Sequence, residues 1–146
     1  MLSRATTFAA LLVMIAPAFA QAADPFDMKG RWVGKTHSIV AGKGGHWPTS
    51  TGTIEKPGLF EKDIVWEVKG QQDTRFWGVM TMSGGNERTE EPFIGELYGK
   101  DGMHVITADT DGFQWGEIDG DTFNFCYAHA GKPSSVVSCT VVKRAR

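Results

Sequence analysis

Short runs in which apolar and polar residues alternate follow one another along most of this chain. The clearest run covers residues 63–69 (DIVWEVK), where Ile64, Trp66 and Val68 fall on one side and charged residues on the other. A period of two is typical of a β-strand with one buried face. Similar alternation predicts further strands over residues 30–40, 49–56 and 136–142.

Three Asp-Gly pairs divide the C-terminal half of the chain into short segments. They are Asp101-Gly102, Asp111-Gly112 and Asp119-Gly120. Asp-Gly between apolar runs is the strongest short signal for a two-residue hairpin loop. The pairs therefore predict consecutive antiparallel strands, a meander.

A two-residue loop at each Asp-Gly pair also predicts the register of these strands. Leu97 then faces Ile106, Ala108 faces Trp115, and Phe113 faces Cys126. Opposed residues share a face, so the predicted core face holds Phe93, Leu97, Ile106, Ala108, Phe113, Trp115 and Cys126. The predicted outer face holds Glu96, Thr107, Asp109, Gln114, Phe123, Phe125 and Tyr127.

The last three residues of that outer face form an aromatic stripe. A contiguous apolar stripe on an exposed face is typical of a covered surface. Phe123, Phe125 and Tyr127 are therefore predicted to contact a second copy or a protein partner. The alternative is that the register differs and these residues belong to the core.

The remaining segments complete an all-β architecture. Residues 74–82 are apolar on both faces, and residues 41–48 and 83–91 are rich in polar residues and glycine and predict loops. Eight or nine short strands without a crossover helix are most simply buried in a closed, antiparallel up-and-down barrel. A β-sandwich is the alternative.

The first residues resemble a secretory signal peptide. Arg4 precedes an apolar run at residues 8–15, and small residues follow at Ala20 and Ala22. The run is shorter than the ~20 apolar residues of a membrane span, and Pro17 interrupts it. We therefore expect a signal peptide at residues 1–22 and a single domain at residues 23–146, exported to the periplasm or the extracellular space, with no membrane span.

Two cysteines, Cys126 and Cys139, fall in the predicted meander. In an exported chain, such a pair is typical of a disulfide. A redox-active pair is disfavoured because there is no C-x-x-C spacing. The sequence therefore predicts a bond that joins the last two strands.

Charge and motifs exclude several classes of function. The formal net charge is −2 and there is no basic patch, which argues against nucleic-acid binding. The four histidines have no metal-ligand spacing, and no nucleophile–base arrangement is readable. We expect no metal, no cofactor and no enzymatic activity.

The segment Gly30-Arg31-Trp32 resembles the opening of the first strand in the calycins, the lipocalin, fatty-acid-binding and avidin-like barrels. The resemblance implies that Trp32 closes one end of the barrel and that a basic residue after the last strand, Lys143 or Arg144, packs across it. It also implies a barrel mouth able to hold a small ligand. The residues that could line this cavity are Trp66, Trp77, Phe113 and Trp115. The alternative is that these aromatics fill the core.

The predicted function is therefore the binding of a small apolar or amphipathic ligand by an exported barrel. One alternative is a protein-interaction module, such as an inhibitor of a hydrolase, which could also be a homo-oligomer. Another is an enzyme of unknown reaction, for which the sequence offers no catalytic constellation.

Overall fold

The computed structural model describes residues 24–43, 49, 51–131 and 133–146, and the predicted signal peptide lies outside these ranges. The described residues contain strands and turns but no helix, and so none that could cross a membrane. The strands are β1 (Gly30–Lys43), β2 (Thr51–Gly52), β3 (Gly58–Gln72), β4 (Arg75–Gly84), β5 (Glu87–Tyr98), β6 (His104–Ala108), β7 (Phe113–Asp119), β8 (Thr122–His129) and β9 (Ser134–Arg144).

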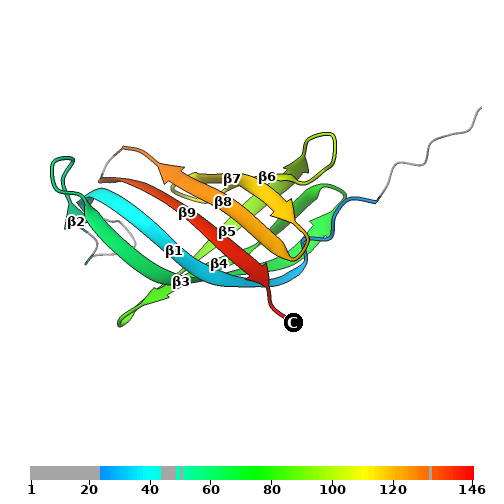
Figure 1. Ribbon diagram of the computed structural model, residues 1–146, viewed down its shortest axis with the longest axis horizontal. Helices are drawn as coiled ribbons and strands as arrows, with labels where there is room; N and C mark the ends of the chain where they lie inside the picture. Colours follow the sequence, from blue (N-terminus) through cyan, green and yellow to red (C-terminus); the bar gives the residue numbers. More distant parts are fainter. Residues whose placement is uncertain (1–23, 44–48, 50, 132) are drawn as a thin grey trace, which may run out of the picture.

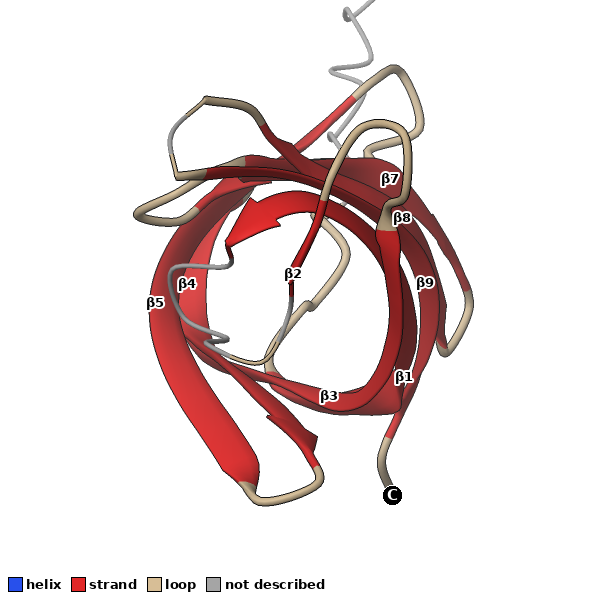
Figure 2. Ribbon diagram, turned by 90° about the vertical axis from the view of Figure 1, so that its left-hand side faces the viewer, coloured by secondary structure: helices blue, strands red, loops and turns tan. Residues whose placement is uncertain are grey.

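The strands form a closed antiparallel barrel (Figure 1). From β3 to β9 each strand pairs with the next one in the sequence, and β1 pairs with both β3 and β9. The two-residue strand β2 is added to the end of β1. The predicted up-and-down barrel is confirmed, and the sandwich alternative is wrong. Figure 2 looks into the barrel from the end at which β2 lies, here called the β2 end.

The other end of the barrel is closed by Trp32. Its indole Nε1 donates to the carbonyl of Met28 (3.0 Å), and the Arg144 guanidinium lies 4.2 Å from the centre of its ring. Arg144 also donates to the carbonyls of Lys29 and Asp27, both at 2.6 Å. Lys143 is exposed on the outside of the same strand, so Arg144 is the residue that packs across Trp32.

A closely packed aromatic core fills the barrel next to Trp32. Trp66 lies 4.5 Å from Phe93, 5.4 Å from Phe123 and 5.1 Å from Phe125, measured between ring centres. The inward residues of β3 are those that the alternation at 63–69 predicts, since Ile64, Trp66 and Val68 are all buried. This half of the interior is an ordinary apolar core.

The Asp-Gly pairs lie in turns, but the first two loops are longer than the predicted two residues. Tyr98 pairs with His104, Ala108 with Phe113, and Asp119 with Thr122, so the loops have five, four and two residues. The five-residue loop shifts β6 by one position relative to β5. A shift of one position exchanges the inner and outer faces.

The predicted core face is consequently wrong for β6 and β7. Phe93 and Leu97 of β5 are buried, but Ile106, Ala108, Phe113 and Trp115 are exposed. Phe123 and Phe125 are almost completely buried, and Tyr127 also points inward. The predicted interface stripe is therefore part of the interior, which was the stated alternative.

Three further expectations, about residues 83–91, 49–56 and 41–48, need correction or lie partly outside the described residues. The predicted loop at residues 83–91 is instead the tight hairpin between β4 and β5, in which Gly84 pairs with Glu87. The predicted strand at residues 49–56 is reduced to β2. Of the predicted loop at residues 41–48, positions 41–43 belong to β1 and positions 44–48 lie outside the described residues.

The predicted disulfide is confirmed. Cys126 and Cys139 are directly opposed on β8 and β9, and their sulfur atoms are bonded. They lie on the outer side of the barrel, because their neighbours Phe125 and Thr140 point inward. The bond joins β8 to β9, which is the strand that closes the barrel against β1, and it restricts the unfolded chain.

Candidate functional site: the polar end of the barrel interior

Toward the β2 end, the inner surface of the barrel changes from apolar to polar. Successive inward positions on a strand are two residues apart, so the change can be followed along β9, where buried Val142 is followed by Thr140, Ser138 and, further along, Ser134. Polar residues also point inward toward this end on β1, β3, β5, β6, β7 and β8, whereas β4 stays apolar, with Met80 and Met82 pointing inward. The polar residues that point inward are Thr36, Ser38, Lys62, Thr89, Glu91, Thr107, Gln114, Tyr127, His129, Ser134, Ser138 and Thr140.

These side chains form continuous rows around the barrel. In one row, Lys62, Thr36, Thr140 and Phe125 are neighbours across β3, β1, β9 and β8. The next row toward the β2 end contains Ser38, Ser138, Tyr127, Gln114 and Thr107. We call this group of inward polar residues the polar end.

Part of the polar end is satisfied by its own hydrogen bonds. Gln114 accepts from the Thr107 hydroxyl and donates through Nε2 to Asp109 Oδ2 at 2.8 Å. Asp109 in turn accepts from the backbone N–H of Asp111 (3.0 Å) and Gly112 (2.7 Å). This group holds the β6–β7 hairpin, so we assign it a structural role.

A second chain of hydrogen bonds lies nearer the rim of the barrel. The Tyr127 hydroxyl is 2.8 Å from His129 Nδ1, and His129 Nε2 is 3.2 Å from the Ser134 hydroxyl. Burial raises the pKa of the Tyr127 phenol far above its usual value, and the nearby carboxylates Asp109 and Glu91 act in the same direction. The phenol therefore keeps its proton and can donate it to Nδ1.

The direction in which these hydrogen bonds are donated argues against Ser134 as a nucleophile. If Tyr127 donates to Nδ1 of a neutral His129, the hydrogen of the ring is on Nε2 and points at Ser134. A general base must instead present a free nitrogen to the hydroxyl it activates. The chain orients polar groups at the rim, and we do not interpret it as a catalytic relay.

Three buried polar atoms have no hydrogen-bond partner among the described residues. They are the indole Nε1 of Trp66 and the hydroxyls of Thr89 and Thr140. Trp66 is completely buried and Thr140 is 3% exposed. An unpaired buried donor or hydroxyl costs about 1–3 kcal/mol. Both residues lie beside Phe125, at the boundary between the apolar core and the polar end.

Lys62 adds an ammonium group to the inner surface. It is 9% exposed, and its Nζ lies 5.6 Å from the centre of the Phe60 ring. Burial lowers its pKa to about 8, and the charge of Glu87 partly opposes this effect. In the described part of the chain, no group of three or more His, Cys, Asp or Glu residues is arranged to hold a metal ion.

The four predicted cavity residues do not lie together. Trp66 is inside the barrel, but Trp77, Phe113 and Trp115 are 48%, 50% and 41% exposed on its outer face. The prediction that these three line the interior is therefore wrong. Comparisons of the chain with protein-family models, with curated proteins and with solved structures gave no match.

Sequence reasoning missed most of the polar end, although one signal was available. Extending the alternation of residues 63–69 backward places Lys62 on the same face as Trp66. No equivalent signal marks Thr107 and Gln114, because each is flanked by apolar residues that are better suited to a core.

Proposed function

We propose that this protein is an exported binding protein that holds a small amphipathic molecule in the polar end of its barrel. The observation that carries the proposal is the pair of buried, unpartnered polar atoms, Trp66 Nε1 and Thr140 Oγ1. An eight-stranded barrel can be filled entirely by apolar side chains. Buried polar groups that do not serve the fold are what a ligand site requires.

The positions of these groups indicate the chemistry of the ligand. Trp66 Nε1 can only donate, so it suits a carbonyl or carboxylate oxygen of the ligand. The Thr140 hydroxyl can donate or accept, and the Phe125 ring, which neighbours both residues, offers an apolar surface. A molecule with a small apolar body and at least one acceptor oxygen matches this arrangement, and Lys62 favours an acidic group.

Export rests on a separate observation. The disulfide between Cys126 and Cys139 is typical of an oxidising compartment. Together with the signal-like first residues, it supports the periplasm or the extracellular space as the place where the protein acts.

Native mass spectrometry of the protein purified from its own producing cells tests the proposal. We expect a non-covalent adduct of small mass that is lost on denaturation. Thr140→Val and Trp66→Phe should each raise the dissociation constant of the adduct about tenfold and so lower its occupancy, because each removes one hydrogen bond of roughly 1.4 kcal/mol.

The matched control is Trp77→Phe, an equivalent change at a tryptophan on the outer face. It should leave the adduct unchanged. A wild-type protein that carries no adduct and takes up none from an extract of its own cells would contradict the proposal, as would equal retention in all variants.

A further inference from the structure

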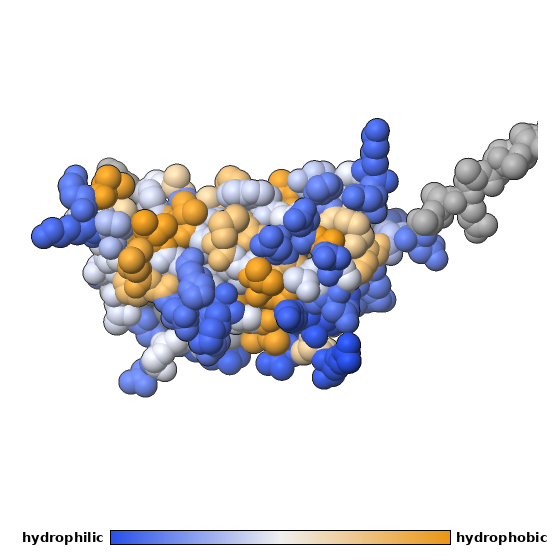
Figure 3. Space-filling model, viewed as in Figure 1, coloured by the Kyte–Doolittle hydropathy of each residue, from blue (hydrophilic) through white to orange (hydrophobic). Residues whose placement is uncertain are grey.

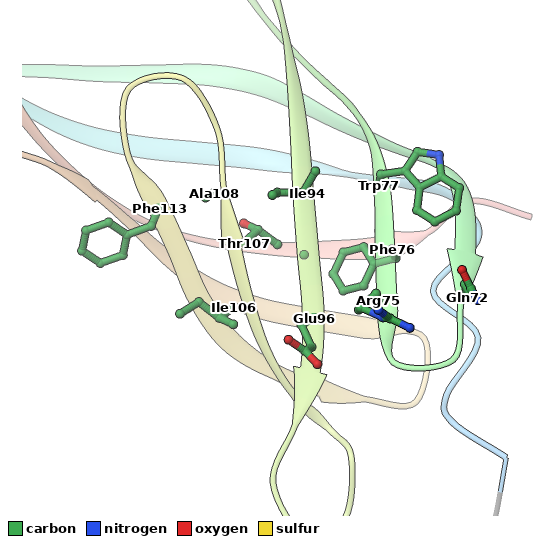
Figure 4. A pocket seen from close by; sticks show the side chains of 11 residues that line it. Gln72, Arg75, Phe76, Trp77, Ile94, Glu96, Ile106, Thr107, Ala108 and Phe113 are labelled. Carbon is green, nitrogen blue, oxygen red and sulfur yellow. The ribbon is translucent and has the colours of Figure 1, made fainter.

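Large apolar side chains lie together on the outer face of β4, β5, β6 and β7. Trp77, Ile94, Ala108 and Phe113 are consecutive cross-strand neighbours, and Ile106 and Trp115 form a second pair beside them. Figure 4 shows all of these side chains except Trp115 around a groove, whose volume is about 590 Å³. We call the six residues the outer apolar face.

The opposite side of the barrel is different. Figure 3 shows the face that carries β1 and β9, where apolar side chains are interrupted by hydrophilic ones. Lys35, for example, contacts Glu61 at 2.7 Å and Asp63 at 3.4 Å on this face. Its exposed apolar side chains include the aliphatic row Leu59, Ile39 and Val137, which are cross-strand neighbours on β3, β1 and β9. The outer apolar face differs from this row because it also carries Trp77, Phe113 and Trp115.

The outer apolar face is large enough to form the centre of a protein interface. Its five large side chains are 41% to 68% exposed. At that exposure they present on the order of 500 Å² of apolar surface, of which Trp77 and Ile94 supply about half, and a stable interface buries roughly 800 Å² on each partner. The polar residues at its border would supply the remainder.

The face also complements itself. Arg75 is directly opposite Glu96, and Trp77 is directly opposite Ile94, on β4 and β5. A twofold axis that lies in the interface and runs along the strands between β4 and β5 exchanges the two strands. It places Arg75 of each copy against Glu96 of the other, and Trp77 of each copy against Ile94 of the other. Such reciprocal contacts are what a symmetric dimer requires. The side chains of β6 and β7 then lie to one side of the axis, facing β3 and β1 of the other copy.

The geometry points to a second copy of this chain as the occupant of the outer apolar face, giving a twofold dimer with Trp77 and Ile94 at its centre. Trp77 is suited to this position, because its indole lies against Gly70, where any larger side chain would collide with the ring. The indole is therefore held before association, and aromatic anchors of this kind dominate interface energies. This inference does not depend on ligand binding in the barrel interior.

Sedimentation equilibrium of the purified full chain tests the inference. We expect a reversible dimer, and Ile94→Lys should raise its dissociation constant more than about a hundredfold, because each dimer would bury two lysines among apolar groups. Val137→Lys is the matched control, since it introduces the same charge at a comparably exposed valine of β9. It should leave the dissociation constant unchanged.

Charge reversal distinguishes a second copy from any other partner. Arg75→Glu should weaken the dimer, because it places a second carboxylate against that of Glu96 across the axis, and the double variant Arg75→Glu with Glu96→Arg should restore it. A wild-type protein that remains monomeric at high concentration would overturn the inference. This holds even if that monomer binds vesicles or another protein through the outer apolar face. Failure of the double variant to recover would also overturn it. Ligand adducts are measured separately, so a monomer that keeps its adduct contradicts the dimer alone.

Discussion

Strands β3 and β7 each carry a tryptophan near their centre, and the two side chains point in opposite directions. On β3, Trp66 is buried and the charged residues beside it face solvent. On β7, Trp115 is 41% exposed while Gln114 beside it is completely buried. Strand β3 follows the usual rule that apolar residues face the core from Ile64 to Val68, whereas the first half of β7 reverses it.

The reversal has two causes that act on the same strands. The inner surface of β6 and β7 belongs to the polar end, where Thr107 and Gln114 bond each other and Asp109. Their outer surface belongs to the outer apolar face, which includes Phe113. A strand with a polar site on its inner side and an interface on its outer side is not expected to place apolar residues inside and polar residues outside. The violation of the pattern thus marks the two surfaces for which we propose functions.

The largest expected difference between β3 and β7 follows from replacing the tryptophan of each strand with alanine. Trp66→Ala should lower the free energy of unfolding by about 3–5 kcal/mol, because it opens a cavity in the aromatic core. Trp115→Ala should lower it by less than ~1 kcal/mol, because the side chain is half exposed. Urea unfolding, at a concentration where the protein is monomeric, measures both. Equal losses would show that β7 is not reversed.

Lys62 gives a second test of the polar inner surface, since it is a charged residue on the inner side of β3. Its pKa is about 8 in the folded protein and about 10.5 in the unfolded chain. Between these values the unfolded chain binds more protons, so the free energy of unfolding should rise with pH, by up to ~3 kcal/mol in total.

Lys62→Met provides the reference for this measurement. The difference in unfolding free energy between wild type and Lys62→Met should change between pH 8 and the onset of tyrosine ionisation near pH 10, in favour of wild type as the pH rises. A pH-independent difference would show that Lys62 is solvated in the folded protein.

The closed end of the barrel gives a smaller effect. Arg144→Ala should lower the free energy of unfolding by about 2 kcal/mol, because it removes the cation over Trp32 and two hydrogen bonds to backbone carbonyls. Lys143→Ala, at the adjacent exposed position, should cost less than ~0.5 kcal/mol. Thermal unfolding of the two variants side by side decides whether Arg144 or Lys143 packs across Trp32.

The architecture could be predicted from local signals. Alternation identified the middle of β3, residues 63–69, and the Asp-Gly pairs located the turns of the meander. The register could not be predicted, because an Asp-Gly pair does not determine loop length. Gly102 has a φ of 67°, but it lies within a five-residue loop rather than a two-residue one. The resulting shift of one position reversed the assigned faces of β6 and β7.

The candidate site was harder to predict than the fold. Burial was assigned from hydrophobicity, and this rule fails where the interior is polar. The period of two correctly predicts that Phe123, Phe125 and Tyr127 share one face of their strand. It does not show which face this is, and only the closed barrel shows that their common side is the interior.

The most direct test of the account is the free energy of unfolding of ligand-free Thr140→Val, compared with Thr107→Val. Both changes replace a buried threonine with a residue of nearly equal volume. Thr140 has no hydrogen-bond partner among the described residues, whereas Thr107 bonds Gln114. If the Thr140 hydroxyl is kept for a ligand, Thr140→Val should stabilise the protein by about 1 kcal/mol while Thr107→Val destabilises it by about 1–3 kcal/mol. Destabilisation by Thr140→Val as large as that by Thr107→Val would show that the hydroxyl serves the fold, and would contradict a ligand site in the polar end.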